Sequence, residues 1–151
     1  MDCSLLLGLP AELRTYIFTL ALQQPVSICA SELWRTRVPE PPLAQTNAQI
    51  RSECLPIFYK CNTFTVYSWY DLRSFLQSLR DTKLAMLEDV RLTRLPGRLV
   101  SIGMLRSLEI HGLKDDALKI EVYVAEVGDW VWLTCKSAVR LLERERGSSQ
   151  I

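Results

Sequence analysis

The fold is decided by residues 43–69, which read LAQTNAQIRSECLPIFYKCNTFTVYSW. The first part of this stretch predicts a helix, because side chains suited to one buried face recur at helical spacing. These side chains are Leu43, Asn47, Ile50, Cys54 and Phe58. Pro56 lacks a backbone N–H and crowds the preceding turn, so we expect it to kink this helix or to restart it. The residues from Thr63 to Trp69 are rich in β-branched and aromatic side chains and predict a strand. A helix that leads directly into a strand indicates a mixed fold.

A second helical pattern precedes this stretch. Pro10 suits the first position of a helix, and Glu12 lies in the first turn, where the helix dipole favours negative charge. The apolar side chains that follow at helical spacing are Leu13, Tyr16, Ile17 and Leu20. We expect this helix to end before Pro25. A short strand over residues 26–30 and a loop over residues 35–42, which contains three prolines, complete the N-terminal part.

Downstream of residue 70 the pattern predicts first a helix and then strands. Asp71 is the expected N-cap of a third helix. Beyond it, apolar side chains alternate with polar ones, which predicts strands with one solvent-exposed face. The alternating residues are Val90 and Leu92, Leu108 and Ile110, and Ile120, Val122 and Val124. Two interpretations remain for residues 129–135, namely a strand that follows a hairpin at Gly128-Asp129, or a final helix with Asp129 as its N-cap. In both, the residues just before Gly147 are helical.

Together these elements predict a single α+β domain over residues 1–146, followed by a frayed tail over residues 147–151. We expect about four helices packed on one face of a mostly antiparallel sheet. The length of 151 residues matches one domain. Hydrophobic residues make up 48% of the chain and charged residues 23%, a composition that excludes a disordered protein.

The charge and the cysteines restrict the partner and the compartment. The chain has 18 basic and 17 acidic residues, a net charge of +1, and no cluster of Lys and Arg, so it predicts neither a nucleic-acid nor a membrane partner. No stretch is long and apolar enough for a transmembrane helix, and the first residues do not resemble a signal peptide. The five cysteines form no C-x-x-C pair and predict reduced, buried thiols. These features indicate a cytoplasmic or nuclear protein.

His111 is the single histidine and the first candidate for catalysis. It lies near three carboxylates in the sequence, those of Glu109, Asp115 and Asp116, and such a group suits a general base or a metal site. A polar turn at the edge of a sheet explains the same residues, because their spacing matches no metal geometry. The chain also contains no phosphate-binding glycine motif and no nucleophile elbow. We therefore expect no catalytic, metal-binding or cofactor-binding residues and no enzymatic activity. A cryptic enzyme built around His111 is the alternative.

Trp34 is a candidate binding residue. It lies beside Arg35 and Arg37 at the start of the proline-rich loop, and Trp and Arg dominate the energetics of many protein interfaces. If it is buried, the same indole holds the loop against the domain. We count Trp34 among the candidate partner-binding residues.

Two motifs resemble, in their order, the signature of a large fungal F-box-like family. The first is LLGLPAELRTYIF at residues 6–18, which is similar to the family's LP-x-E-L-R-x-x-I helix. The second is QIRSECLPIFY at residues 49–59, followed by NTF at residues 62–64. The resemblance covers residues 5–69. It implies an F-box-like domain whose first helix docks on the adaptor subunit of a cullin-type ubiquitin ligase, while the rest of the chain binds a target.

By position in the motif, the resemblance implies that an apolar ridge binds the adaptor subunit; its residues are Leu9, Pro10, Leu13, Ile17 and Phe18. The chain departs from an ordinary F-box, because a predicted strand and a proline-rich loop separate the first helix from the second. Since the predicted sheet also needs helices to cover it, the same side chains could belong to the core. We therefore predict a protein–protein interaction module that resembles an F-box-like substrate adaptor. The alternative is a stand-alone fungal interaction protein with this fold but no ligase docking. The bound target and the oligomeric state stay open.

Overall fold

The computed structural model describes residues 5–30, 40–79, 81–93, 113–114, 116–124 and 129–148. Within these residues the elements are, in chain order, α1 (Ala11–Leu22), β1 (Ile28–Cys29), the 3-10 helix η2 (Pro42–Gln45), α3 (Ala48–Cys61), β2 (Thr63–Val66), α4 (Trp69–Ser78), α5 (Asp81–Leu84), β3 (Asp89–Leu92), β4 (Leu118–Val124), β5 (Asp129–Thr134) and α7 (Cys135–Ser148). The α+β class predicted from the sequence is confirmed. The predicted strand around Leu108 and Ile110 and the end of the predicted tail lie outside the described residues.

The strands form one sheet in the order β1-β2-β3-β4-β5. Three of the four pairings (β1 with β2, β2 with β3, and β3 with β4) are parallel, and only the pairing of β4 with β5 is antiparallel. The prediction of a mostly antiparallel sheet is therefore wrong. The physical reason is the order of elements, because a helix between two neighbouring strands returns the chain to the same end of the sheet and makes the strands parallel.

One face of the sheet is apolar and buried, and the other is polar. When consecutive parallel strands are neighbours in the sheet and their crossover connections have the same handedness, the connecting helices lie on the same face of the sheet. The aromatic contacts agree with this, since the Phe64 ring on β2 lies 5.8 Å from Phe58 on α3 and 5.6 Å from Phe75 on α4. The neighbouring buried side chains on this face are Val66, Val90, Leu92, Leu118 and Ile120. The opposite face carries Thr63, Thr65, Asp89, Arg91 and Lys119, which is why the sequence shows polar residues at alternate positions although the sheet is mostly parallel.

Local signals determine where α3 and α4 begin. The Asn47 Oδ1 atom accepts a hydrogen bond from the Gln49 backbone N–H (2.7 Å) and so caps α3, while the preceding turn is the separate helix η2. Pro56 lies inside α3, and the helix does not restart there. The N-cap of α4 is Ser68 rather than the predicted Asp71. The Ser68 hydroxyl accepts a bond from the Asp71 backbone N–H and donates one to the Asp71 carboxylate (2.8 Å), so Asp71 supports the cap from the first turn.

The C-terminal part decides between the two interpretations of residues 129–135. Asp129–Thr134 is strand β5, paired with β4 from Lys119↔Thr134 to Val124↔Asp129, and helix α7 starts only at Cys135. The strand interpretation is thus the correct one. Asp129 is itself a residue of β5, opposite Val124, and Gly128 lies outside the described residues. The Thr134 Oγ1 atom accepts a bond from the Ser137 backbone N–H (3.4 Å) where the strand turns into the helix.

The described cysteines, which are Cys29, Cys54, Cys61 and Cys135, are all free thiols that are buried or half-buried. Burial raises the pKa of the Cys54 and Cys61 thiols, which lowers their reactivity as nucleophiles. This agrees with the predicted role of the cysteines as packing residues.

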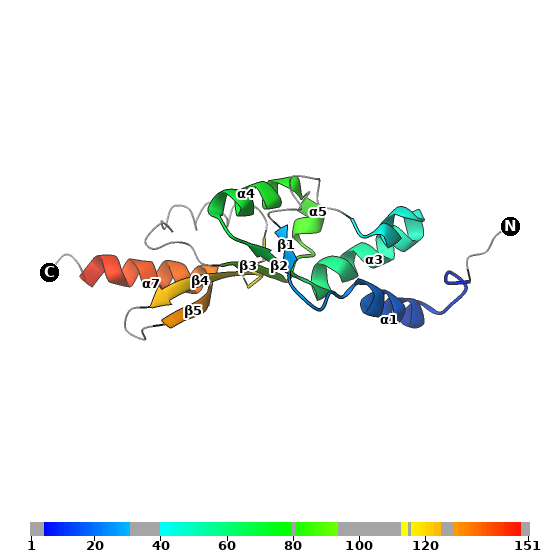
Figure 1. Cartoon of the computed structure of the whole chain (residues 1–151), viewed down its shortest axis with the longest axis horizontal. Coiled ribbons are helices and arrows are strands. Elements are labelled where there is room, and N and C mark those ends of the chain that lie inside the picture. The colour runs from blue at the N-terminus through cyan, green and yellow to red at the C-terminus, as the bar shows by residue number, and fades with distance from the viewer. Residues whose placement is uncertain are drawn as a thin grey trace.

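The molecule is elongated, with the sheet in its middle (Figure 1). Helices α1 and α3 lie side by side at one end, and β4, β5 and α7 form the other end. Helices α4 and α5 lie between these ends. The two ends therefore offer surfaces that are far apart.

Tyr59 on α3 is a buried residue whose chemistry yields a prediction. Its side chain is fully buried, and within the described residues its hydroxyl has no hydrogen-bond partner. Burial, with a smaller effect from the negative charge of Glu40, raises the pKa of Tyr59 from 10.0 to about 12. Above pH 10 the unfolded chain therefore loses this proton while the folded chain keeps it, so the stability of the fold falls as the pH rises from about 10 to about 12.

We expect Tyr59→Phe to stabilise the fold by about 1 kcal/mol at neutral pH, because it removes a buried hydroxyl that lacks a partner. Between pH 10 and 12 the advantage of the variant should grow by about 2 kcal/mol, since phenylalanine does not titrate. Urea unfolding of both proteins across this pH range measures the difference. A constant difference at all pH values would contradict the raised pKa.

Candidate protein-binding surface on helix α1

Helix α1 starts and ends at clear local signals. Pro10 is its N-cap residue, one position earlier than the first helical position that the sequence predicted for it, and Glu12 lies in the first turn as expected. Inside the helix, the hydroxyls of Thr15 and Thr19 donate hydrogen bonds to the carbonyls four residues earlier (2.9 and 2.8 Å), so these polar side chains are satisfied within the helix itself. Gln23 closes the helix with a bond from its backbone N–H to the Thr19 carbonyl (3.0 Å).

One face of α1 is apolar and exposed. Leu13 is 51% exposed, Tyr16 64%, Ile17 38% and Leu20 63%. These four residues stand at positions i, i+3, i+4 and i+7, so they form one continuous stripe along the helix, which we call the α1 stripe. Four neighbouring large apolar side chains that are left in solvent are unusual in a small domain and mark a candidate binding surface.

The opposite face of α1 packs against α3. Phe18 and Leu22 are buried there as part of the core, one turn apart. Arg14 lies one turn before Phe18 and forms a bidentate ion pair with Glu53 on α3. The Nε atom is 2.8 Å from Oε2, and the Nη2 atom is 3.0 Å from Oε1. Both the apolar and the polar contacts of α1 with α3 therefore lie on the face opposite to the α1 stripe. These contacts orient the stripe towards solvent.

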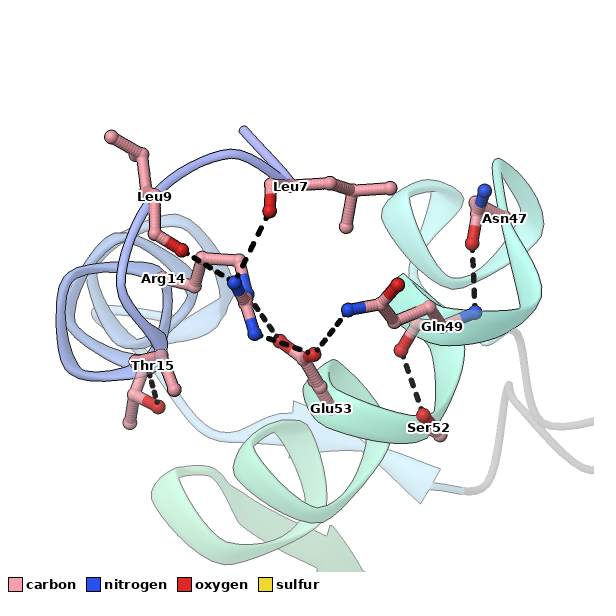
Figure 2. Close-up of polar contacts among 9 residues, drawn as sticks. Leu7, Leu9, Arg14, Thr15, Asn47, Gln49, Ser52 and Glu53 are labelled. Carbon is pink, nitrogen blue, oxygen red and sulfur yellow. Dashed lines mark hydrogen bonds and ion pairs between the residues drawn. The ribbon is translucent and has the colours of Figure 1, made fainter. Parts of the chain in front are cut away.

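The ion pair between Arg14 and Glu53 is the centre of a larger polar network (Figure 2). Gln49, one turn earlier on α3, donates from its side-chain amide to Glu53 (3.1 Å), and Arg14 also donates to the carbonyls of Leu7 and Leu9. The hydrogen bond from Arg14 and, to a smaller extent, the one from Gln49 lower the pKa of Glu53, so this carboxylate stays charged at neutral pH. The network fixes both α3 and the segment before α1 relative to the helix.

A second connection joins the C-terminal ends of the two helices. Asn62 is almost fully buried and donates from its side-chain amide to the carbonyls of Leu22 on α1 and Phe58 on α3, both at 2.9 Å. Its Oδ1 atom accepts a bond from the Gln24 backbone N–H (2.7 Å). Helix α1 is thus fastened near its start by Arg14 and at its end by Asn62, and the α1 stripe is presented on a rigid element.

The structure separates the residues that the resemblance grouped together. Leu13 and Ile17 lie on the exposed α1 stripe, Pro10 is exposed at the start of the helix, and Leu9 is half-buried. Phe18 belongs to the core, where no partner could reach it in the folded chain. Trp34 lies outside the described residues. Sequence reasoning left Tyr16 and Leu20 out of the site although the spacing of the apolar residues contained the signal for both.

The alternative site around His111 has no structural description. His111, Glu109 and Asp115 lie outside the described residues, and Asp116 is exposed. In the part of the chain that is described, no three or more His, Cys, Asp or Glu side chains are grouped so as to hold a metal ion. Among the described helices, none combines the length and the apolar character needed to cross a bilayer.

The chain matches no protein-family model, and it shows no significant similarity to any curated protein or to any solved structure with which it was compared.

Proposed function

We propose that the chain is a non-catalytic protein-interaction module that docks on its partner through the α1 stripe. In its specific form, the proposal is that the partner is the adaptor subunit of a cullin-type ubiquitin ligase, with the rest of the domain available to bind a target. The observation that carries the proposal is the exposure of Leu13, Tyr16, Ile17 and Leu20 on one face of one helix.

The chemistry of the α1 stripe suits a partner with an apolar groove. An amphipathic helix binds such a groove through side chains at i, i+3, i+4 and i+7, which is the spacing of the α1 stripe. Tyr16 adds an aromatic ring with a polar tip, a residue type that is enriched where binding energy is concentrated.

The anchoring of α1 supports docking without rearrangement. A surface that is already ordered loses little conformational freedom when it binds, and this favours affinity. The motifs that resemble the F-box-like family supply this anchoring, since Arg14 belongs to the first motif, and Glu53 and Asn62 belong to the second. The motif residues thus have a structural role in presenting the helix, while the α1 stripe is the part left for a partner.

The proposal predicts that Leu13→Asp and Ile17→Asp each weaken binding to the adaptor subunit by at least about tenfold, because each places a charge in an apolar contact. The whole chain is used for co-purification with the adaptor subunit, followed by a titration that gives the dissociation constant. The fold should be retained, because both side chains are exposed. Circular dichroism and the urea midpoint verify this.

The matched control is Tyr67→Asp, which changes a large side chain that is 57% exposed but lies outside α1. It should leave binding unchanged. If the wild-type chain does not bind the adaptor subunit, the ligase form of the proposal is lost, and the stand-alone interaction protein becomes the better interpretation. If the Leu13 and Ile17 variants bound the adaptor subunit as tightly as the wild-type chain does, the α1 stripe would not be the binding site.

A further inference from the structure

Strand β5 forms a second exposed surface, at the end of the molecule opposite to α1 (Figure 1). In the part of the sheet that the structure describes, β5 is the last strand and has β4 as its only strand neighbour. Its sequence is DWVWLT, with neither proline nor lysine, and its pairing with β4 runs through six consecutive residue pairs without a bulge. Edge strands that lack these protective features are templates for pairing with another strand.

The two tryptophans of β5 share one face of the sheet. Trp130 and Trp132 are each 40% exposed and stand two residues apart, so both point to the polar face of the sheet. Arg91 of β3 lies over the Trp132 ring at 5.8 Å from its centroid, and Arg91 is in turn paired with Asp89 (2.9 Å). This cation–π contact favours one orientation of the Trp132 ring, and a side chain that is already ordered loses less freedom when it binds.

The other face of β5 borders a shallow basic groove. It is lined by Leu133 of β5 and by three residues of α7, namely Ser137, Arg140 and Arg144, of which the two arginines are one turn apart. Arg140 and Arg144 are both exposed. Because Leu133 and three residues of α7 line the same groove, the groove lies on the face of β5 that α7 covers.

We propose that β5 pairs with β5 of a second copy of this chain, antiparallel about a twofold axis at Val131. In an antiparallel pair, residues directly opposite each other lie on the same face. This register sets Trp130 opposite Trp132 of the other copy, twice, and gathers four indole rings on one face. It also sets Asp129 opposite Leu133 of the other copy, on the face that carries the basic groove.

Charge complementarity selects this register and this occupant. Asp129 is exposed at the start of β5, and the partner copy's carboxylate would arrive beside Leu133, next to Arg140. By symmetry the contact forms twice, as expected of a twofold interface. The net charge of +1 per chain opposes self-association only weakly. The resulting dimer would carry one α1 stripe at each of its two distant ends. Both stripes would stay accessible, so the dimer neither requires nor prevents the proposed function of α1.

The test uses the full chain and measures mass against concentration by light scattering and analytical ultracentrifugation. We expect a reversible dimer. Asp129→Arg and Arg140→Asp should each raise its dissociation constant by about tenfold or more, because each places like charges together twice. The double variant, Asp129→Arg with Arg140→Asp, should restore the wild-type constant to within about threefold, because the pairs form again with reversed sign.

Two matched variants separate this surface from others. Arg73→Asp changes an exposed arginine of α4 by the same charge and should leave the dimer intact. Leu13→Asp in α1 should also leave it intact. Circular dichroism confirms that every variant is folded. A chain that stays monomeric at concentrations well above micromolar overturns the proposal, as does a dimer that the β5 variants leave unchanged or that Leu13→Asp abolishes. A monomer that instead binds an extended peptide at this edge also overturns it.

Discussion

Replacing Phe64 by alanine should destabilise the fold by about 3–5 kcal/mol, the largest effect that we expect from a single core substitution in this chain. Phe64 is fully buried in β2 and contacts aromatic rings from two helices on the same face of the sheet: Phe58 and Tyr59 on α3 at 5.8 and 5.9 Å, and Phe75 on α4 at 5.6 Å. Its removal leaves a cavity where two helices meet the sheet. Since domains of this size are stable by only about 5–15 kcal/mol, a large part of the stability would be lost.

Urea unfolding gives the difference in the free energy of unfolding, and two matched variants make it interpretable. Phe64→Leu keeps most of the volume and should cost less than about half as much as the alanine variant. Tyr67→Ala removes an aromatic side chain that lies three residues further along but is 57% exposed, and it should change stability by no more than about 0.5 kcal/mol. If Phe64→Ala and Tyr67→Ala proved equally mild, the interpretation of Phe64 as the residue that joins α3, α4 and the sheet would be wrong.

Much of the fold could be predicted because local signals coincide with the final elements. The helical spacing after Pro10, the β-branched run from Thr63 and the alternation at Val90 and Leu92 all correspond to observed helices and strands. The direction of the strands could not be read from the same alternation. A solvent-exposed polar face is typical of antiparallel sheets. Here such a face arises because the helices that connect the parallel strands lie on the other face of the sheet.

The order of elements contained the missing information about strand direction. A strand before residue 30, a helix up to Cys61, a strand from Thr63, a helix after Ser68 and a strand from Asp89 form two strand–helix–strand units in a row. Such units require parallel strands, whatever the alternation of polar residues suggests. The prediction of antiparallel strands relied on the alternation of apolar and polar residues within each strand. It did not use the helices that connect one strand to the next.

The candidate site shows a different limit. Leu13, Ile17 and Phe18 are all apolar and near one another in sequence, yet Phe18 is buried and the other two are exposed. The rotation of α1 about its own axis decides which residues face α3, and that rotation is set by contacts with residues far along the chain. Arg14 and Glu53 are separated by 39 positions, so no local pattern in α1 reveals their ion pair. Sequence periodicity therefore finds an apolar helix but does not say which face packs.

The connection between the helices at Asn62 leads to the second large effect. Asn62→Ala should cost about 2–4 kcal/mol, because it leaves the buried carbonyls of Leu22 and Phe58 without their donor and the Gln24 N–H without its acceptor. The loss should be concentrated at the end of α1. Hydrogen exchange should therefore become faster for the amides at the C-terminal end of that helix, while urea unfolding reports the total change in stability.

Asn47→Ala is the matched control, since it removes the same side chain from a cap of α3 whose single bond, from the Gln49 N–H, is exposed. It should cost only about 1 kcal/mol and leave exchange in α1 unchanged. Because Asn62 fixes α1 against α3, its alanine variant should also weaken whatever binds the α1 stripe, although Asn62 itself is buried and cannot touch a partner. Equal costs for the two asparagines, or unchanged exchange at the end of α1, would show that the buried amide does not fasten the helix.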